Sequence, residues 1–392
     1  MANKPIKIVM ASGATGGHAY PCLVVADAIR ELQPDARFLF IGASGKIDQD
    51  IILKHGYEFA AIKASGFCRG PSFGGLAKTL LAAARLITLG PLFEALRHLG
   101  RFWPDVVFGA GGYVSGAVIA AAWLRRIPRA ILEANAVPGL ANRLAARLVD
   151  RIYIGFEPVA KYFNAPGKTV LTGNPVRPVS ESRGRGMRDQ MGFDSKKLLV
   201  VIVGGSLGSR FLNDLCASVI PMINNNANVS SRVEVFHCVG QRFWEDAALE
   251  HSESAQVYAR DLRLRYIRVP YAEGLSDLLA AADVAICRGG ASTLSELALA
   301  GAASIVIPWP QAANNEQVKN AEYFAQNGAC FLLKEHECDP STLFSRLAEL
   351  VLDDNLREQM RVRSRQLARP RAANDIAKSL IRLCGGSVVE VG

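Results

Sequence analysis

The stretch Ile6-Lys-Ile-Val-Met-Ala-Ser-Gly-Ala-Thr-Gly-Gly-His18 runs from an apolar, β-branched segment into a glycine-rich turn. The second half of the chain repeats this arrangement in Leu198-Leu-Val-Val-Ile-Val-Gly-Gly-Ser-Leu-Gly-Ser209. A segment with helical periodicity follows each turn, so each stretch is predicted to form a strand, a turn and the start of a helix. The unpaired N–H groups and positive dipole of such a helix start favour phosphate. We therefore expect two α/β domains and an anionic ligand, although either turn alone is also typical of an ordinary tight connection.

The composition is that of a globular protein with an anionic partner. The chain has 392 residues, more than one hydrophobic core usually supports, of which 50% are hydrophobic and 21% charged. Arg85 and Arg125 interrupt the most apolar segments and the N-terminal residues lack a signal core, so we expect a cytoplasmic protein without a membrane span. The net charge of +9 suits phosphates, an acidic membrane or nucleic acid. Nucleic acid is disfavoured because no aromatic-basic stacking motif is found.

Strand-like runs alternate with helix-length segments through both halves, which predicts parallel sheets covered by helices. The segment 173–192, rich in Gly, Ser and Arg, is interpreted as a linker. We expect Rossmann-like domains over residues 1–175 and 176–370, and a tail, 371–392, whose helix at 372–383 crosses back to the first domain. The expected strands are residues 6–10, 36–41, 106–108, 129–132, 151–155, 198–203, 233–239, 266–269, 284–287 and 303–307.

Neither the cysteines nor the acidic residues indicate a metal or another cofactor. The eight cysteines include no C-x-x-C pair and lie mostly in apolar segments, which indicates free buried thiols. Asp48-Gln-Asp50 resembles the D-x-D motif with which some glycosyltransferases hold a metal, but it fits better as acidic residues at a helix start. We expect no metal and no cofactor.

The strongest motif of the second half is Asp283-Val-Ala-Ile-Cys-Arg-Gly-Gly-Ala-Ser-Thr-Leu-Ser-Glu296. A strand runs into Arg-Gly-Gly, and the next helix carries hydroxyls in its first turn and a carboxylate one turn in. These groups can hold a diphosphate and both hydroxyls of a ribose, which predicts a sugar-nucleotide site. An ordinary capped helix would explain the serine and the glutamate but not the Arg-Gly-Gly. Amides in residues 310–321, after the next strand, suit sugar hydroxyls or form a solvated loop.

The first glycine turn does not match a dinucleotide site. Its pattern is G-x-x-G-G rather than G-x-G-x-x-G, and the second strand ends without the acidic residue that holds an adenosine ribose. His18 ends this turn at a helix start, where it is either a reacting group or a solvated cap. We favour the reacting group because His18 is the one side chain of the turns that titrates near neutral pH.

Two segments mix apolar and basic side chains, residues 73–103 and Trp123-Leu-Arg-Arg126. Such a mixture suits the boundary of an acidic bilayer, and it is equally typical of a packed core with basic flanks. The membrane interpretation predicts a protein that lies on the bilayer without crossing it.

Six motifs resemble, in their order along the chain, those of the MurG family of N-acetylglucosaminyltransferases. The resemblance covers almost the whole chain, from residue 6 to about residue 375. It implies the GT-B fold, two Rossmann-like domains facing across a cleft, with UDP-N-acetylglucosamine as donor. The implied acceptor is lipid I, an undecaprenyl-diphosphate-linked muramoyl pentapeptide at the cytoplasmic face of the inner membrane, and the product is lipid II for peptidoglycan synthesis. The motifs are Gly13-Ala-Thr-Gly-Gly-His18, Gly111-Gly-Tyr-Val-Ser-Gly116, Glu133-Ala-Asn135, Gly173-Asn-Pro-Val-Arg177, Gly204-Gly-Ser-Leu-Gly208 and Arg288-Gly-Gly-Ala-Ser-Thr-Leu-Ser-Glu296.

The resemblance also implies roles for single residues. The residues near the donor sugar and its diphosphate would be Thr15, Gly16 and Gly17, with the sugar bound by Asn135 and Gln317. The phosphates would be bound by Arg177 and Ser206, and uracil by the backbone of Ala272. Phosphates and ribose would be held by Ala291, Ser292, Thr293, Leu294, Ser295 and Glu296, with Glu296 on the diol. The acceptor side would comprise His18, Gly111, Gly112, Tyr113 and Ser115.

Three positions depart from the family pattern. Leu132 and Ala134 stand in the family's His-Glu-Gln-Asn motif, and Leu207 stands in its Gly-Gly-Ser-Gln-Gly motif. Because Asn135 and Ser206 remain, we expect an active hexosyltransferase. It would use an inverting, metal-independent displacement by the acceptor 4-hydroxyl at the donor C1, with His18 as general base. Two alternatives stay open: a related GT-B enzyme with another lipid acceptor, and a nucleotide-sugar-binding protein without turnover.

Overall fold

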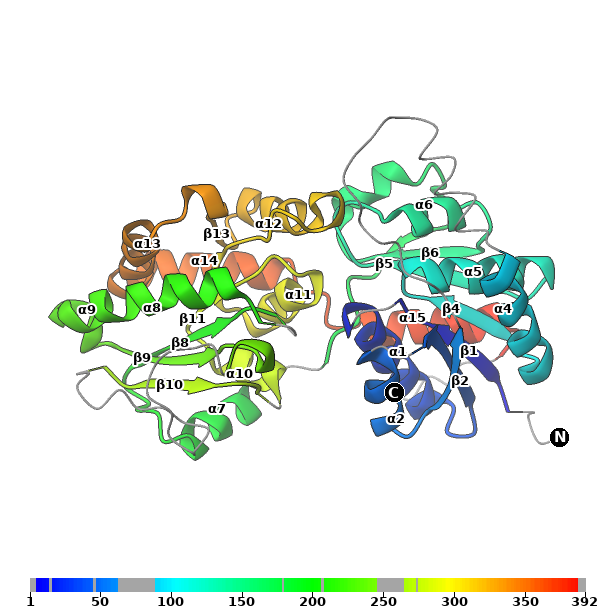
Figure 1. Cartoon of the computed structure of the whole chain (residues 1–392), viewed down its shortest axis with the longest axis horizontal. Helices are drawn as coiled ribbons and strands as arrows, with labels where there is room; N and C mark the ends of the chain where they lie inside the picture. Colours follow the sequence, from blue (N-terminus) through cyan, green and yellow to red (C-terminus); the bar gives the residue numbers. More distant parts are fainter. Residues whose placement is uncertain are drawn as a thin grey trace. The chain divides into compact units, whose positions relative to one another are not determined.

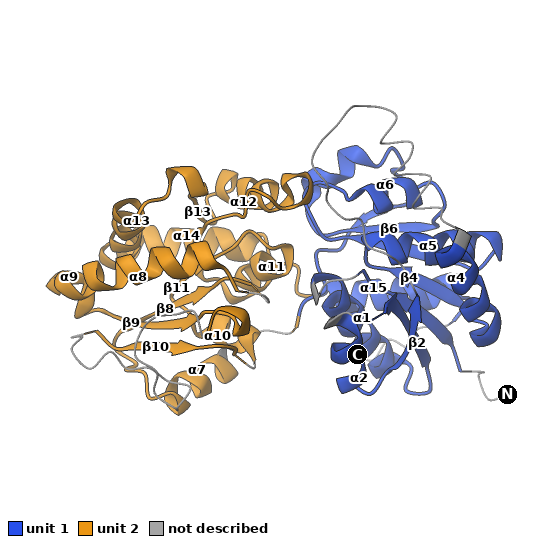
Figure 2. Cartoon of the chain, in the orientation of Figure 1, with its two compact units in different colours: residues 1–176, 371–392 blue, residues 177–370 orange. Residues whose placement is uncertain are grey.

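The computed structural model describes residues 5–13, 16–44, 47–62, 89–177, 180–205, 208–244, 264–272 and 274–386 (Figure 1). The chain forms two compact units, unit 1 of Met1–Val176 with Arg371–Gly392 and unit 2 of Arg177–Pro370 (Figure 2). Each unit is a parallel β-sheet covered by helices, which confirms the predicted pair of α/β domains.

Within the described residues, unit 1 has a seven-stranded parallel sheet in the order β3-β2-β1-β4-β5-β6-β7. After Lys7, strand β1 is apolar because alternate residues enter different hydrophobic cores: Ile8 and Met10 belong to one core, and Val9 and Ala11 to the other. The carboxyl ends of parallel strands lie at one edge, so the turns after β1, β4 and β5 are neighbours. The strands are β1 (Lys7–Ala11), β2 (Arg37–Ala43), β3 (Glu58–Ile62), β4 (Val106–Gly109), β5 (Arg129–Glu133), β6 (Arg151–Ile154) and β7 (Thr169–Leu171).

The helix at the end of the chain completes a core of unit 1. Helix α15 (Ala372–Leu383) packs beside α1 (Gly16–Leu32), and Ile376 and Leu380 share the core of Ile8. The Tyr153 hydroxyl of β6 donates to Ser379 Oγ at 2.7 Å. The remaining helices of unit 1 are α2 (Ile47–Lys54), α4 (Leu89–Phe102), α5 (Gly112–Leu124), α6 (Leu140–Ala145) and the 3₁₀ helix η1 (Glu157–Tyr162).

Unit 2 has, in its described part, a six-stranded parallel sheet in the order β10-β9-β8-β11-β12-β13. Val200 and Ile202 of β8 pack in one core with Leu212 of α8 and Leu347 of α13. The strands are β8 (Leu198–Val203), β9 (Val233–Cys238), β10 (Tyr266–Val269), β11 (Val284–Cys287), β12 (Ala303–Val306) and β13 (Phe331–Leu332). The helices are α7 (Glu181–Gln190), α8 (Arg210–Asn225), α9 (Ala227–Ser230), α10 (Leu275–Ala281), α11 (Ala291–Ala300), α12 (Glu316–Gln326), α13 (Pro340–Leu352) and α14 (Asp354–Gln366), with 3₁₀ helices η2 (Gln241–Phe243), η3 (Ala313–Asn315) and η4 (Glu335–Glu337).

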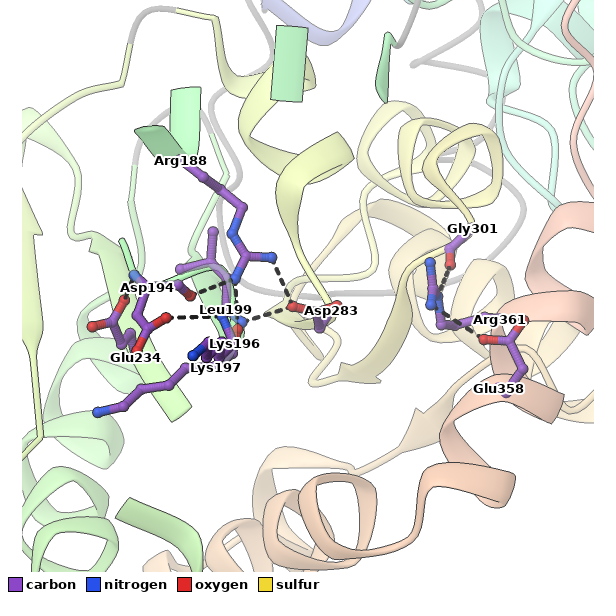
Figure 3. A network of polar contacts seen from close by, with 10 residues as sticks. All are labelled: Arg188, Asp194, Lys196, Lys197, Leu199, Glu234, Asp283, Gly301, Glu358 and Arg361. Carbon is purple, nitrogen blue, oxygen red and sulfur yellow. Dashed lines mark hydrogen bonds and ion pairs between the residues drawn. The ribbon is translucent and has the colours of Figure 1, made fainter. Parts of the chain in front are cut away.

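The interpretation of residues 173–192 as a linker is wrong for α7. Ser180 caps this helix by accepting a backbone N–H of its first turn at 3.4 Å. Arg188 forms an ion pair with Asp283 at 3.1 Å, and Asp283 also accepts from the Leu199 N–H at 2.8 Å (Figure 3). These contacts fasten the polar helix to the second sheet, so its low hydrophobicity does not make it a loose connection.

The expected strands are present to within two residues at each end, and β3, β7 and β13 are additional strands that have no counterpart among the expected runs. The seven described cysteines are free thiols, six of them buried, as predicted; Cys68 lies outside the described residues. No helix in the described ranges is both long and apolar enough to cross a membrane.

Candidate active site

Glycines bring the first glycine turn into contact with the turn that opens α5. At Gly112 φ is +81°, and a Cβ there would lie 2.6 Å from the Cα of Gly13. At Gly111 φ is +96°, which also favours glycine. Gly13, after β1, and Gly112, after β4, are therefore in close backbone contact at the carboxyl edge of the first sheet.

The imidazole of His18 lies beside Gly13 and Gly111. A Cβ on Gly13 would lie 2.6 Å from His18 Nδ1, and one on Gly111 would lie 3.2 Å from His18 Cδ2. Burial lowers the pKa of His18 to about 4, so the ring is neutral near pH 7 and one of its nitrogens carries a lone pair. A neutral imidazole at this position can accept a proton from a bound hydroxyl.

The buried carboxyl group of Asp48 contacts Ser12, the residue before Gly13. Asp48 lies in the first turn of α2 with no exposed surface, and its Oδ2 accepts from Ser12 Oγ at 3.3 Å. Burial raises the pKa of Asp48 to about 6. Asp48 and Asp50 thus lie at a helix start, as predicted, and Asp48 supports the residue that precedes Gly13.

A second buried carboxylate, Glu133 at the end of β5, organises the loop that carries Asn135. Its Oε1 accepts from the Asn135 N–H at 3.0 Å. Its Oε2 accepts from the Gly139 N–H at 3.0 Å and from Asn142 Nδ2 at 2.8 Å. Burial raises the pKa of Glu133, while these hydrogen bonds oppose the rise. Sequence reasoning assigned no role to Glu133, although it lies within one of the six motifs.

The residues predicted for the acceptor side and the donor sugar differ in how exposed they are. Tyr113 is half-buried beside Gly112, whereas Ser115 is 1% exposed and packs against Gly109. The Ser115 hydroxyl thus faces β4, and the assignment of Ser115 to the acceptor side stays a prediction. Gly16 and Gly17 open α1, and Thr15 lies outside the described residues.

In unit 2 the starts of α11 and α12 lie side by side. A Cβ on Gly289 would collide with the Gln317 carbonyl oxygen, so only glycine permits this approach. Asn320 Nδ2 donates to the Gly289 carbonyl at 3.1 Å, and Gln317 Oε1 accepts from the Trp309 N–H at 3.0 Å. Two helix starts thus present backbone N–H groups at one edge of the second sheet, which suits an anion.

Glu296 lies one turn inside α11 and is held by a neighbouring helix. Its Oε1 accepts from Ser276 Oγ of α10 at 2.8 Å. Burial raises the pKa of Glu296, whereas the Ser276 hydrogen bond and the charge of Arg177 oppose this rise. The structure therefore brings three residues together in unit 2: Arg177, Ser276 and Glu296.

The Arg288 side chain makes hydrogen bonds and an ion pair within unit 2. Its Nε and Nη2 donate to Ser209 Oγ at 3.0 and 2.6 Å, and its Nη1 donates to the Ile307 carbonyl at 3.0 Å. The same Nη1 forms an ion pair with Glu335 at 2.6 Å. The guanidinium thus connects Ser209, at the start of α8, to Ile307, just after β12, and to η4.

The other predicted donor residues divide into exposed and internal groups. Ser292 and Thr293 are half-exposed in the first turn of α11, whereas Leu294 is fully buried and Ser295 Oγ donates to the Ala291 carbonyl at 2.9 Å. Ala291 can offer a ligand only its backbone, and the Leu294 N–H already donates to the Gly290 carbonyl at 3.0 Å. Ala272 is half-exposed in the loop between β10 and α10, and Ser206 lies outside the described residues.

Comparisons with known proteins agree along both units. Residues 8–154 match the glycosyltransferase family 28 N-terminal domain, and residues 199–378 match the glycosyltransferase family 28 C-terminal domain. The UDP-N-acetylglucosamine–N-acetylmuramyl-(pentapeptide) pyrophosphoryl-undecaprenol N-acetylglucosamine transferase of Desulforudis audaxviator is 35% identical over 97% of this chain and 99% of that protein. The Bacillus cytotoxicus protein of the same name is 33% identical over 96% of this chain and 99% of its own length.

Solved structures agree with these relatives. The crystal structure of Acinetobacter baumannii MurG aligns with a TM-score of 0.72 at 25% identity, covering 96% of this chain and 100% of that one. The calicheamicin glycosyltransferase CalG4 aligns with a TM-score of 0.68 over 97% of this chain and 99% of its own. At 13% identity that second likeness concerns the fold alone.

Proposed function

The chain belongs to glycosyltransferase family 28, among the UDP-N-acetylglucosamine–N-acetylmuramyl-(pentapeptide) pyrophosphoryl-undecaprenol N-acetylglucosamine transferases, and from this premise we propose its reaction. It transfers N-acetylglucosamine from UDP-N-acetylglucosamine to lipid I and so makes lipid II for peptidoglycan. The observation that carries the proposal is the start of α11, where backbone N–H groups lie one turn from the Glu296 carboxylate. A diphosphate and a ribose diol need these two groups at this spacing.

We propose that unit 2 holds the donor. The diphosphate lies at the start of α11 with Arg177, the ribose diol donates to Glu296, and uracil meets the backbone of Ala272. Gln317 reads the sugar from the start of α12, next to Gly289. The charge of Arg177 stabilises the ionised Glu296 carboxylate, so the two groups are close enough to interact electrostatically. Arg177 can therefore neutralise negative charge on the diphosphate as UDP departs.

Unit 1 supplies the acceptor side in this proposal. The acceptor 4-hydroxyl attacks the donor C1, the C1–O bond to UDP breaks, and the hydroxyl proton passes to His18, directly or through a water. His18 is neutral near pH 7, so it can take this proton, and the anionic diphosphate of lipid I would raise its low pKa toward the working range. Asn135, fixed by Glu133, contributes to binding the sugar.

We also propose that unit 1 docks on the cytoplasmic face of an anionic membrane. Phe93 on α4 is 68% exposed and Trp103, next to its end, is 72% exposed, with Arg97 and Arg101 on the same helix. Exposed aromatic rings with nearby cations are suited to the headgroup region. Vesicle flotation tests this proposal: the protein should bind vesicles containing phosphatidylglycerol more strongly than vesicles of phosphatidylcholine alone. Equal binding to both would contradict docking on an anionic membrane.

The activity is tested with labelled UDP-N-acetylglucosamine and either lipid I or diacylglycerol. Transfer to lipid I is expected. Transfer to diacylglycerol alone would favour a related lipid glycosyltransferase, and UDP binding without transfer to either acceptor would identify a binding protein.

The role of His18 is tested with His18→Ala. Loss of a proton acceptor should lower kcat by a factor on the order of 10²–10⁴ and remove the acidic limb of the pH profile. An unchanged turnover and pH profile would exclude His18 as the base.

A further inference from the structure

We infer that Ser276 is a positioning residue that makes the donor site selective for ribose, because it fixes the carboxylate that receives the ribose hydroxyls. This inference rests on the proposed function, in which Glu296 binds the diol of the donor. Ser276 belongs to none of the six sequence motifs and has no role among the predicted site residues.

Among the described residues, the side chain of Ser276 has Glu296 as its hydrogen-bond partner. Ser276 is 5% exposed in the first turn of α10, and its Oγ donates to Glu296 Oε1 at 2.8 Å. A hydroxyl has one proton, so this donation commits it to the carboxylate, whereas an ionised carboxylate has about four acceptor positions on its two oxygens. Ser276 therefore uses one acceptor position, limits rotation of the carboxylate, and leaves Oε2 for the ribose.

The hydrogen bond also favours the ionised form that two ribose hydroxyls require. Burial of Glu296 disfavours its charge, and the Ser276 hydroxyl and Arg177 are the groups that oppose this effect. A protonated carboxyl group presents an O–H where a ribose hydroxyl needs an acceptor. Removing Ser276 thus weakens diol binding both by loosening the carboxylate and by favouring its neutral form.

Helix α10 is anchored independently of the donor, which makes Ser276 a fixed support. Asp277, the next residue, forms an ion pair with Arg183 of α7 at 2.9 Å. A Cβ on Gly184 would lie 3.0 Å from the Ala281 nitrogen, so α7 and α10 are in close contact. The loop that enters α10 carries Ala272, so the uracil contact and the support of the ribose carboxylate lie on one continuous segment.

The inference is tested by titrating UDP and 2′,3′-dideoxy-UDP into the full chain by calorimetry. The ratio of the two dissociation constants measures diol recognition. Ser276→Thr keeps a hydroxyl and Ser276→Val has the same shape without one, so their comparison isolates the hydroxyl even if Ser276→Ala fails to fold. Ser364→Ala is the matched control, because Ser364 is equally buried and its Oγ donates to α11 at the Leu297 carbonyl, at 3.4 Å.

We expect UDP affinity to fall about tenfold in Ser276→Ala and Ser276→Val, with the dideoxy affinity nearly unchanged and the ratio kept in Ser276→Thr and Ser364→Ala. In a Glu296→Gln background, Ser276→Val should have no further effect on the ratio. Equal ratios in the Thr and Val variants would overturn the inference while UDP binding and sugar transfer by the wild type still support the proposed function. If the wild type does not bind UDP, the proposed function fails as well.

Discussion

Glycine at position 112 is expected to stabilise unit 1 by several kilocalories per mole relative to alanine. Replacing it by alanine imposes a strained backbone, since φ is +81°, and places a Cβ 2.6 Å from the Gly13 backbone, which has no flexible end to move away. The left-handed conformation costs about 1–2 kcal/mol and overpacking costs about 1–3 kcal/mol. The loss of unfolded-state freedom returns about 0.4–1 kcal/mol. We therefore expect Gly112→Ala to lower the free energy of unfolding by about 3 kcal/mol.

Two other glycines of unit 1 separate the two causes. Gly56 has φ of +74° and Gly167 does not have positive φ, and a Cβ on either meets nothing within 4 Å. Gly56→Ala should cost about 1 kcal/mol from backbone strain alone, and Gly167→Ala should be neutral or slightly stabilising. Urea unfolding followed by circular dichroism gives the three values. If Gly112→Ala and Gly56→Ala agree within about 0.5 kcal/mol, the two turns do not touch as described.

Three further predictions concern charged side chains. Burial raises the pKa of Asp48 to about 6, so the folded protein favours the protonated carboxyl group. The stability that this preference provides is fully present below the unfolded pKa near 4 and is lost as the pH rises through 6. The unfolding free energy of the wild type should therefore fall by about 3 kcal/mol more than that of Asp48→Asn between pH 4 and pH 7. Urea unfolding at several pH values measures this, and an equal fall in the two proteins would contradict it. Arg288→Met leaves Glu335 and Ser209 without their partner and should destabilise unit 2 by about 3–5 kcal/mol in thermal unfolding, partly restored by Glu335→Met; normal stability with lost UDP binding would instead place Arg288 on the ligand. Arg177→Ala should weaken UDP binding about tenfold in calorimetry, and unchanged affinity would remove Arg177 from the phosphate site.

The sequence predicts those parts of the fold that depend on local hydrophobic pattern. Residues 198–203 and 284–287 are continuous apolar runs because both faces of a central parallel strand are buried, and they are strands with the predicted bounds. The edge strand β3 is half-exposed and carries a weaker pattern, and β13 has only two residues. Such short or exposed strands are defined by their neighbours in the sheet.

Long-range polar contacts explain the remaining differences. Helix α7 is polar, and its attachment depends on Arg188 meeting Asp283, 95 residues away. Likewise, Arg288 is committed to Ser209, 79 residues earlier in the chain, which no local motif reveals. The role of Ser276 comes from Glu296, 20 residues away, which the fold brings close. Glu133 has partners only 2 to 9 residues away, but the loop that brings them to its carboxylate has no periodic pattern that predicts these contacts.

The path of the chain gives the two units different places in protein synthesis. Residues 177–370 emerge from the ribosome as one uninterrupted segment, so unit 2 can fold as soon as they are made. Unit 1 begins first, yet Ile376, Ala377, Leu380 and Ile381 of its core are translated after all of unit 2. The nascent N-terminal segment must therefore keep an incomplete apolar surface until the last helix arrives. A stop codon before residue 371 would leave unit 1 in this exposed state and make it a client for chaperones or proteases.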